Sequence, residues 1–283
     1  MKKLFLLLIT LSLCLTSCKN EKDTNDSTTT STTIKPDVET PKKETEVPLE
    51  AKIPESNIVI NPISHGTLVL EYEDFVIYVD PVGGADAFKD QKKPNIILVT
   101  DIHGDHLNVE TLEELTINNS ELIVPIAVKD KLTDDLKKKS SVLVNSQSID
   151  LQLGKTKINI EAVPMYNLRE EALKFHTKER GNGYVLTLGK ERVYISGDTE
   201  DIPEMRKLKN IDIAFVCMNL PYTMTVDSAA SAVLDFNPNK VYPYHYRGTN
   251  GLSDVGKFKD LVNSGNPDIQ VIQLDWYPNR DSK

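Results

Sequence analysis

The sequence predicts an α+β fold in which two β-sheets are covered on their outer faces by helices. Short runs rich in β-branched and aromatic residues, separated by turn signals, occur in two successive groups along the chain. Segments with helical spacing and polar outer faces are interspersed with these runs. Sheets and helices of this kind bury their apolar faces by packing in layers, which places the two sheets at the centre.

The first group of strands begins at residue 58. Residues 58–81 contain short β-rich runs punctuated by Gly66 and by the acidic turn Glu73–Asp74, which predicts a hairpin. Residues 95–100 form a continuous apolar run of the length of a buried strand. Two segments with helical spacing follow: residues 108–116 and 128–139.

The second group opens with two hairpins that each turn at a Gly-Lys pair: residues 151–164 and 184–196. Residues 211–218 predict another buried strand. A helix is predicted from Thr225 to near Pro238, because threonine caps helix N-termini well and proline cannot continue a helix. The predicted elements that end the chain are a strand, a helix and a strand: residues 239–246, 254–265 and 269–276.

The N-terminus has a different character. Two lysines precede a short apolar run, which is typical of a secretory signal and well short of the ~20 residues that span a bilayer. Thr16–Ser17 before Cys18 resembles a bacterial lipobox, which implies a lipoprotein signal peptide over residues 1–17 and lipidation of Cys18. The alternative is an ordinary signal peptide with an incidental cysteine.

Residues 18–54 are predicted to be a disordered tether that extends from the lipidated Cys18. They contain no aromatic residue and too little apolar surface to offset the entropy of ordering. The folded domain is therefore predicted over residues 55–283, in an exported bacterial lipoprotein anchored to a bilayer of the cell envelope, on its periplasmic or surface side. A net charge of −9 disfavours nucleic acid as a partner. The only cysteine of this domain, Cys217, lies in an apolar run and is predicted to be a core residue.

Acidic and histidine side chains follow three of the predicted strands. The candidate ligands at these strand ends are Asp101, His103, Asp105, His106, Asp198 and His245. A lone histidine at a strand end is usually structural, but three such ends in this order favour one shared site. Imidazole and carboxylate together suit zinc, manganese or iron.

These motifs resemble those of the metallo-β-lactamase fold superfamily. "TDIHGDHLN" resembles its H-x-H-x-D-H signature, "YISGDTEDIPEM" its later Gly-Asp motif, and "VYPYHYRG" its final histidine. "SHGTLVLEYEDFVIYVDPV" is similar to the N-terminal hairpin of the L-ascorbate-6-phosphate-lactonase-like branch. The resemblance covers roughly residues 57–275. It implies an αββα sandwich of two mixed β-sheets flanked by helices, with a metal site at one edge of the two sheets.

The resemblance also implies one or two divalent metal ions, foremost zinc, with manganese or iron as alternatives. The residues of the second position are all present: Asp105, His106, His245 and a bridging Asp198. At the first position His103 is the only clear ligand. Asp101 replaces a histidine there and either ligates the ion or accepts a hydrogen bond from a neighbouring imidazole. Asn167 aligns with a missing histidine, and the nearby His176 is either a ligand, a substrate-binding residue or a surface residue.

Two further residues are placed near the site by the resemblance. His65 either orients a ligand or contacts substrate, or is purely structural. Asp80 either hydrogen-bonds a ligating histidine or caps the turn before Pro81.

The implied activity is that of a metal-dependent hydrolase in which metal-activated water attacks an ester, lactone or related bond of a small molecule. Asp105 would orient the water as well as ligate. Two alternatives remain: a phosphodiesterase acting on lipid head groups or nucleotides, and a degenerate member that binds metal or ligand without turnover. An anionic substrate would find four cationic side chains near the site: Arg169, Lys174, Lys178 and Arg180.

Overall fold

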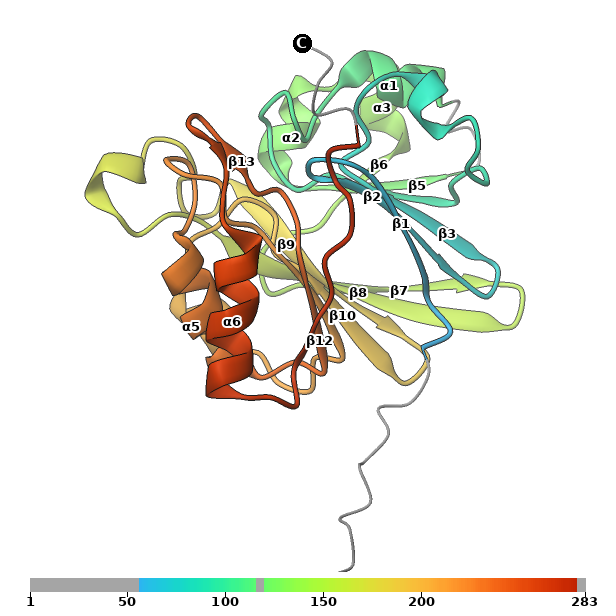
Figure 1. Cartoon of the computed structure of the whole chain (residues 1–283). Helices are drawn as coiled ribbons and strands as arrows, with labels where there is room; N and C mark the ends of the chain where they lie inside the picture. Colours follow the sequence, from blue (N-terminus) through green and yellow to red (C-terminus); the bar gives the residue numbers. More distant parts are fainter. Residues whose placement is uncertain (1–55, 116–119, 279–283) are drawn as a thin grey trace, which may run out of the picture. The chain divides into compact units, whose positions relative to one another are not determined.

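The fold is described by a computed structural model, which covers residues 56–115 and 120–278. The predicted signal peptide and tether lie outside the described residues. Within the described part, two β-sheets face each other and carry helices on their outer sides (Figure 1). The predicted αββα sandwich of two mixed sheets is therefore confirmed.

The first sheet contains six strands that pair in chain order. Its strands are β1 (Val59–Ser64), β2 (Thr67–Tyr72), β3 (Phe75–Val79), β4 (Ile96–Leu98), β5 (Glu121–Val124) and β6 (Ser140–Val142). The first three are antiparallel and turn at Gly66 and at Glu73–Asp74, as predicted, whereas β3 to β6 are parallel. The helical elements around this sheet are η1 (Ala85–Phe88), α1 (Val109–Glu114), α2 (Ile126–Lys131) and α3 (Asp134–Lys139).

The second sheet contains seven strands in the order β15-β12-β11-β10-β9-β8-β7. Its strands are β7 (Ser148–Leu153), β8 (Thr156–Met165), β9 (Gly181–Leu188), β10 (Glu191–Ile195), β11 (Ile213–Val216), β12 (Lys240–Pro243) and β15 (Gln270–Val271). A small ribbon is formed by β13 (Arg247–Gly248) and β14 (Gly251–Leu252). The helical elements of this half are η3 (Glu170–Ala172), α4 (Pro203–Arg206), α5 (Val226–Phe236) and α6 (Val255–Gly265).

Alternation along the strands decides which side chains fill the space between the sheets. In β2, Leu68 and Leu70 belong to the large core between the sheets, whereas Val69 belongs to a smaller cluster beneath α1 to α3. Helix α5 packs on the second sheet through its apolar face, which includes Val233 and Phe236. The central strands of each sheet, such as β3, β4 and β11, are thus buried on both faces, which leaves the edges and loops to carry polar chemistry.

Two predicted elements differ in the structure. The segment 128–139 is not one helix, because Leu132 and Thr133 are extended and a new helix begins at Asp134. The last strand ends at Val271, since the following segment leaves the sheet and the Trp276 carbonyl accepts a hydrogen bond from the His65 N–H (3.2 Å). The N-cap predicted at Thr225 is confirmed, with its hydroxyl accepting from Ser228 N. No helix in the described part of the chain has the length and apolar character needed to cross a bilayer.

Candidate metal centre

Loops at one edge of both sheets carry the predicted ligands. The H-x-D-H loop follows β4 of the first sheet, while Asp198 follows β10 and His245 follows β12 of the second. Strands β10, β11 and β12 are parallel, so their carboxyl ends lie at the same edge. The Asn182 N–H donates to the Thr100 carbonyl (2.9 Å), which ties the loop after β4 to β9 of the other sheet. The centre is therefore built where the two sheets meet.

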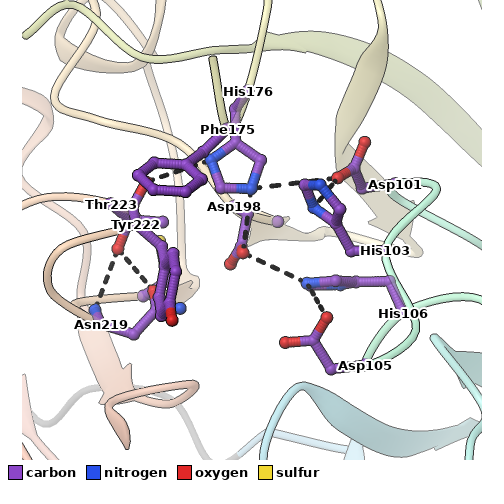
Figure 2. Close-up of polar contacts among 12 residues, drawn as sticks. Asp101, His103, Asp105, His106, Phe175, His176, Asp198, Asn219, Tyr222 and Thr223 are labelled. Carbon is purple, nitrogen blue, oxygen red and sulfur yellow. Dashed lines mark hydrogen bonds and ion pairs between the residues drawn. The ribbon is translucent and has the colours of Figure 1, made fainter. Parts of the chain in front are cut away.

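The four residues predicted for the second position lie together. Candidate ligand atoms of Asp105, His106, Asp198 and His245 all lie within 4.8 Å of one another. The Asp198 carboxylate lies between two imidazoles, 3.4 Å from His106 Nε2 and 3.5 Å from His245 Nε2. Asp105 Oδ2 is 3.3 Å from His245 Nε2. Figure 2 shows His106 and Asp105 on one side of Asp198, with His176 on the other.

Asp80 lies behind His106, on the side away from Asp198. Its Oδ2 is 2.8 Å from His106 Nδ1, and its two oxygens also accept from the Thr100 N–H (2.7 Å) and hydroxyl (2.6 Å). A carboxylate at Nδ1 holds the hydrogen there and leaves Nε2 free to bind an ion. The structure thus places Asp80 in contact with the candidate ligand His106.

Several polar atoms of this cluster have no hydrogen-bond partner among the described residues. These buried atoms are His106 Nε2, His176 Nε2, Asp198 Oδ1, and both ring nitrogens of His245. A buried polar atom without a partner costs free energy, so it is normally bonded to something. Imidazole nitrogens and a carboxylate oxygen converging in this way are the donor set of a zinc, manganese or iron site. The residues therefore fit a divalent metal ion.

The first position is formed by Asp101, His103 and His176, whose candidate ligand atoms also lie within 4.8 Å of one another. His103 Nδ1 is 2.7 Å from Asp101 Oδ2, and His176 Nε2 is 3.9 Å from the same oxygen. His176 Nε2 is also 3.2 Å from Asp198 Oδ2, so Asp198 faces both positions. Arg180 was not foreseen as part of this cluster, yet its guanidinium is bidentate on Asp101, at 3.0 and 2.9 Å.

Asn167 supports the loop between β8 and β9 that carries His176. Its backbone N–H donates to the His176 carbonyl (2.9 Å), and its amide donates to the Ala172 and Tyr222 carbonyls (2.9 and 2.6 Å). These bonds close the loop and bring His176 into the centre from a position nine residues further along the chain. Asn167 Oδ1 is buried without a partner among the described residues.

His65 lies in the turn between β1 and β2 and contacts a candidate ligand. Its Nε2 is 3.4 Å from Asp105 Oδ2, and its Nδ1 is 2.7 Å from the Tyr277 hydroxyl. Its ring lies 3.8 Å from that of His245, centroid to centroid. Burial lowers the pKa of His65 to about 4, so its ring is neutral at pH 7. The structure thus places His65 against Asp105 and His245.

The centre concentrates charges of opposite sign. Burial opposes ionisation of Asp198, but His245 and His106 outweigh it and hold the pKa of this carboxyl well below its usual range. Burial likewise opposes protonation of His106, but Asp198 and Asp80 outweigh it and raise its pKa well above the usual value. The carboxylate is therefore ionised and ready to bind a cation, and an ion binding at His106 must displace a proton.

A cavity of about 370 Å³ opens onto the cluster. Its lining residues are His103, Asp105, Phe175, His176, Asp198, Asn219 and Tyr222. Phe175, Asn219 and Tyr222 were not predicted from the sequence, although Asn219 directly follows a predicted strand, which was an available signal. The ring of Phe175 meets that of Tyr222 edge to face, with centroids 5.0 Å apart. The cavity is therefore lined by four candidate metal ligands, an amide and two aromatic rings.

Comparison with known proteins identifies the family. The family described as the β-lactamase superfamily domain matches residues 57–246. The chain belongs to this superfamily. A protein from Pyrobaculum islandicum described as a metal-dependent hydrolase is 31% identical over 64% of this chain and 81% of its own length. One from Pyrococcus horikoshii, with the same description, is 28% identical over 62% of this chain and 76% of its own length.

Solved structures agree with this assignment. A proposed metal-dependent hydrolase from Parabacteroides distasonis is 40% identical to this superfamily member, with a TM-score of 0.66, over 76% of this chain and 92% of that one. The metallo-hydrolase Igni18 from Ignicoccus hospitalis, 18% identical, shares the fold with a TM-score of 0.63, over 77% of this chain and 94% of that one. This chain is a metal-dependent hydrolase, because it belongs to the superfamily, has relatives of that description and brings candidate metal ligands together. The predicted enzyme class is therefore confirmed.

Proposed function

We propose that this chain hydrolyses an ester, lactone or related bond of a small molecule, as a member of the lactonase-like branch of its superfamily. The observation that carries the proposal is the cavity of about 370 Å³ with Asp105 and Asp198 in its wall. Its volume lies at the small end of the range for ligand pockets, about 300–1,000 Å³. Asp105, His106, Asp198 and His245 would hold a divalent ion, which would supply Lewis acidity and lower the pKa of water to about 7.

Asp105 orients the attacking water in this proposal. Its side chain is 42% exposed, whereas those of His106 and His245 are fully buried. Burial opposes ionisation of Asp105, but the adjacent imidazoles of His245 and His65 outweigh it and hold the pKa of this carboxyl far below its usual range. The carboxylate is therefore ionised at pH 7 and is able to accept a hydrogen bond from a water at the cavity wall.

Asn219 is the group that we assign to the substrate. It is almost fully buried, its Oδ1 accepts a hydrogen bond from the Thr223 hydroxyl (2.5 Å), and it lines the cavity. Because the oxygen is held by Thr223, the amide presents N–H groups to the cavity. A donor at this place suits the carbonyl oxygen of an ester or lactone, where negative charge develops during hydrolysis.

The cations expected to hold an anionic substrate are engaged elsewhere. Arg169 donates to Glu200 (2.6 Å) and to the Pro221 and Thr223 carbonyls (2.9 Å each), and Arg180 is bidentate on Asp101. Neither of them, nor Lys174 or Lys178, is among the cavity's lining residues. This arrangement favours a neutral substrate over the phosphodiester of the alternative function.

The test compares turnover on matched panels of esters, lactones and phosphodiesters by protein loaded with zinc, manganese or iron. We expect ester or lactone hydrolysis that falls at least ~100-fold in Asp105→Asn. The matched control is Asp150→Asn, since Asp150 is exposed on β7 and accepts from Asn159 (2.7 Å). Phosphodiester turnover above that of every ester and lactone would replace the proposal with the phosphodiesterase. Metal uptake without turnover of any substrate would favour a degenerate binding protein.

We also propose that zinc is the resident ion and that the chain is an exported lipoprotein of the cell envelope, anchored through Cys18. Zinc is supported by the two imidazoles and two carboxylates of the second position, which are all zinc ligands in proteins. The anchor is supported by the basic start, the short apolar run and Thr16–Ser17 before Cys18. Expression of the full chain and Cys18→Ala, followed by membrane fractionation and mass spectrometry of the N-terminal peptide, tests it. An unmodified Cys18 in membrane-bound protein would contradict the anchor.

A further inference from the structure

The side chain of Asp101 has no free oxygen. Oδ1 accepts from Arg180 Nε (3.0 Å), and Oδ2 accepts from Arg180 Nη2 (2.9 Å) while it also lies 2.7 Å from His103 Nδ1. Asp101 is fully buried, and the Arg180 side chain is only 16% exposed. A bidentate, buried arginine–carboxylate pair is among the strongest polar contacts in proteins, and removing one partner is costly.

Arg180 is itself fixed in place. Its Nη2 also donates to the carbonyl of Phe175, directly before His176. A guanidinium cannot lose its charge in a protein, so a fixed positive charge lies beside the first position. The oxygen that Arg180 Nη2 binds is the one that lies 2.7 and 3.9 Å from the nitrogens of His103 and His176. An ion bound by both imidazoles would therefore meet an oxygen that is already occupied and a cation next to it.

The second position differs in each of these respects. None of the contacts described for Asp105, His106, Asp198 and His245 involves a lysine or arginine. His106 and His245 present buried nitrogens that have no hydrogen-bond partner among the described residues. The second position offers four ligand residues, two of which are carboxylates. The first position offers two imidazoles and the Asp198 carboxylate, which it shares with the second. The two positions are thus unequal in both ligand number and local charge.

We propose that Arg180 is a positioning residue that keeps Asp101 out of the first metal position. The centre then binds one ion tightly, at the second position, and a further ion only weakly. Asp101 serves instead as the acceptor that orients His103. This inference rests on the proposed metal centre and deepens it, because hydrolysis then depends on the ion held by Asp105, His106, Asp198 and His245.

The test counts zinc ions per chain by mass spectrometry after metal removal, reloading and dialysis. We expect one ion in the wild type and two in Arg180→Met, where the freed Asp101 carboxylate joins His103 and His176. The double variant Arg180→Met/Asp101→Asn is expected to return to one ion, because the freed ligand is gone. The matched control is Arg206→Met, since Arg206 is also partly buried and pairs with Asp201 and Asp235.

Each result decides the inference. Two tightly held ions in the wild type, or one in Arg180→Met, would overturn it. Two ions in the double variant would also overturn it, since the gain would then come from the lost charge and not from Asp101. If the variants do not fold by circular dichroism, calorimetric titration of the metal-free wild type decides: two events at least ~100-fold apart in affinity support the inference, and a smaller gap contradicts it.

Failure of the metal centre itself gives a different result. A wild type that takes up no zinc on titration would overturn the proposed function together with this inference. One ion in each of the four proteins would overturn the inference alone, and the hydrolase proposal would stand.

Discussion

Asp80→Asn changes which ring nitrogen of His106 carries a hydrogen, and it keeps the shape of the site. Asp80 has a φ of 46°, a conformation that asparagine tolerates, so the substitution adds little backbone strain. The asparagine oxygen can replace Oδ1 and accept from the Thr100 N–H, which is 2.7 Å away. The asparagine NH₂ then replaces Oδ2 and faces His106 Nδ1, which must become an acceptor. His106 can then carry a hydrogen only on Nε2, the nitrogen that faces Asp198.

The expected losses of metal affinity and of unfolding free energy follow from the hydrogen bonds that this substitution removes. Partners that orient a ligating imidazole contribute about 10–100-fold to metal affinity, or roughly 1.4–2.7 kcal/mol. The metal-free protein should also lose about 1–3 kcal/mol of unfolding free energy, because a charged buried acceptor is removed. The assays are zinc affinity by competition with a chromophoric chelator and denaturant unfolding of the metal-free protein.

The matched control is Asp212→Asn at the other end of the second sheet. Asp212 also accepts from a backbone N–H, that of Arg192 (2.8 Å), and from the side-chain amide of Asn239 (2.9 Å). Its substitution should leave zinc affinity within about twofold of the wild type, because it touches none of the candidate ligands. Zinc affinity of Asp80→Asn that is equally unchanged would refute the role assigned to this carboxylate.

Three further predictions test other parts of the centre. Gly66→Ala would place a Cβ 2.7 Å from the His245 ring, so zinc affinity should fall about tenfold, while Gly104→Ala, with no atom within 4 Å, should keep it. Glu200→Ala removes a buried acceptor of two backbone N–H groups (2.8 Å each), so the loop between β8 and β9 should exchange amide hydrogens faster by mass spectrometry; unchanged exchange would contradict this. Burial raises the pKa of Cys217 to about 12, so its peptide should remain unlabelled by thiol reagents until the protein unfolds.

Much of the fold could be predicted because its elements are locally encoded. The turns at Gly154 and Gly189 have positive φ, which glycine adopts without strain, and both predicted hairpins form around them. The helix after Thr225 begins at a side-chain cap and ends before Asn237, which is left-handed. The segments that differ depend on distant partners: residues 273–277 leave the sheet, and Trp276 and Tyr277 bind the turn that carries His65.

The clustering of the candidate ligands also depends in part on local sequence. Asp105 and His106 follow β4 within a few residues, so their convergence is set by one loop, and the strand order then brings Asp198 and His245 to the same edge. The approach of His176 depends on bonds between its loop and Tyr222, some 46 residues away, which no local pattern encodes.

Secondary structure, the layered fold and the set of residues able to bind metal follow from the amino-acid sequence, because strand periodicity, turn glycines and donor chemistry are local properties. The pairing of Arg180 with Asp101, which makes the two positions unequal, follows only from the folded chain. Folding places Arg180 on Asp101 across 79 residues and leaves the other cluster without a lysine or arginine among its described contacts. Charge pairing in a buried site depends on distances of about 3 to 4 Å between side chains, and these distances are set when the sheets and loops pack together.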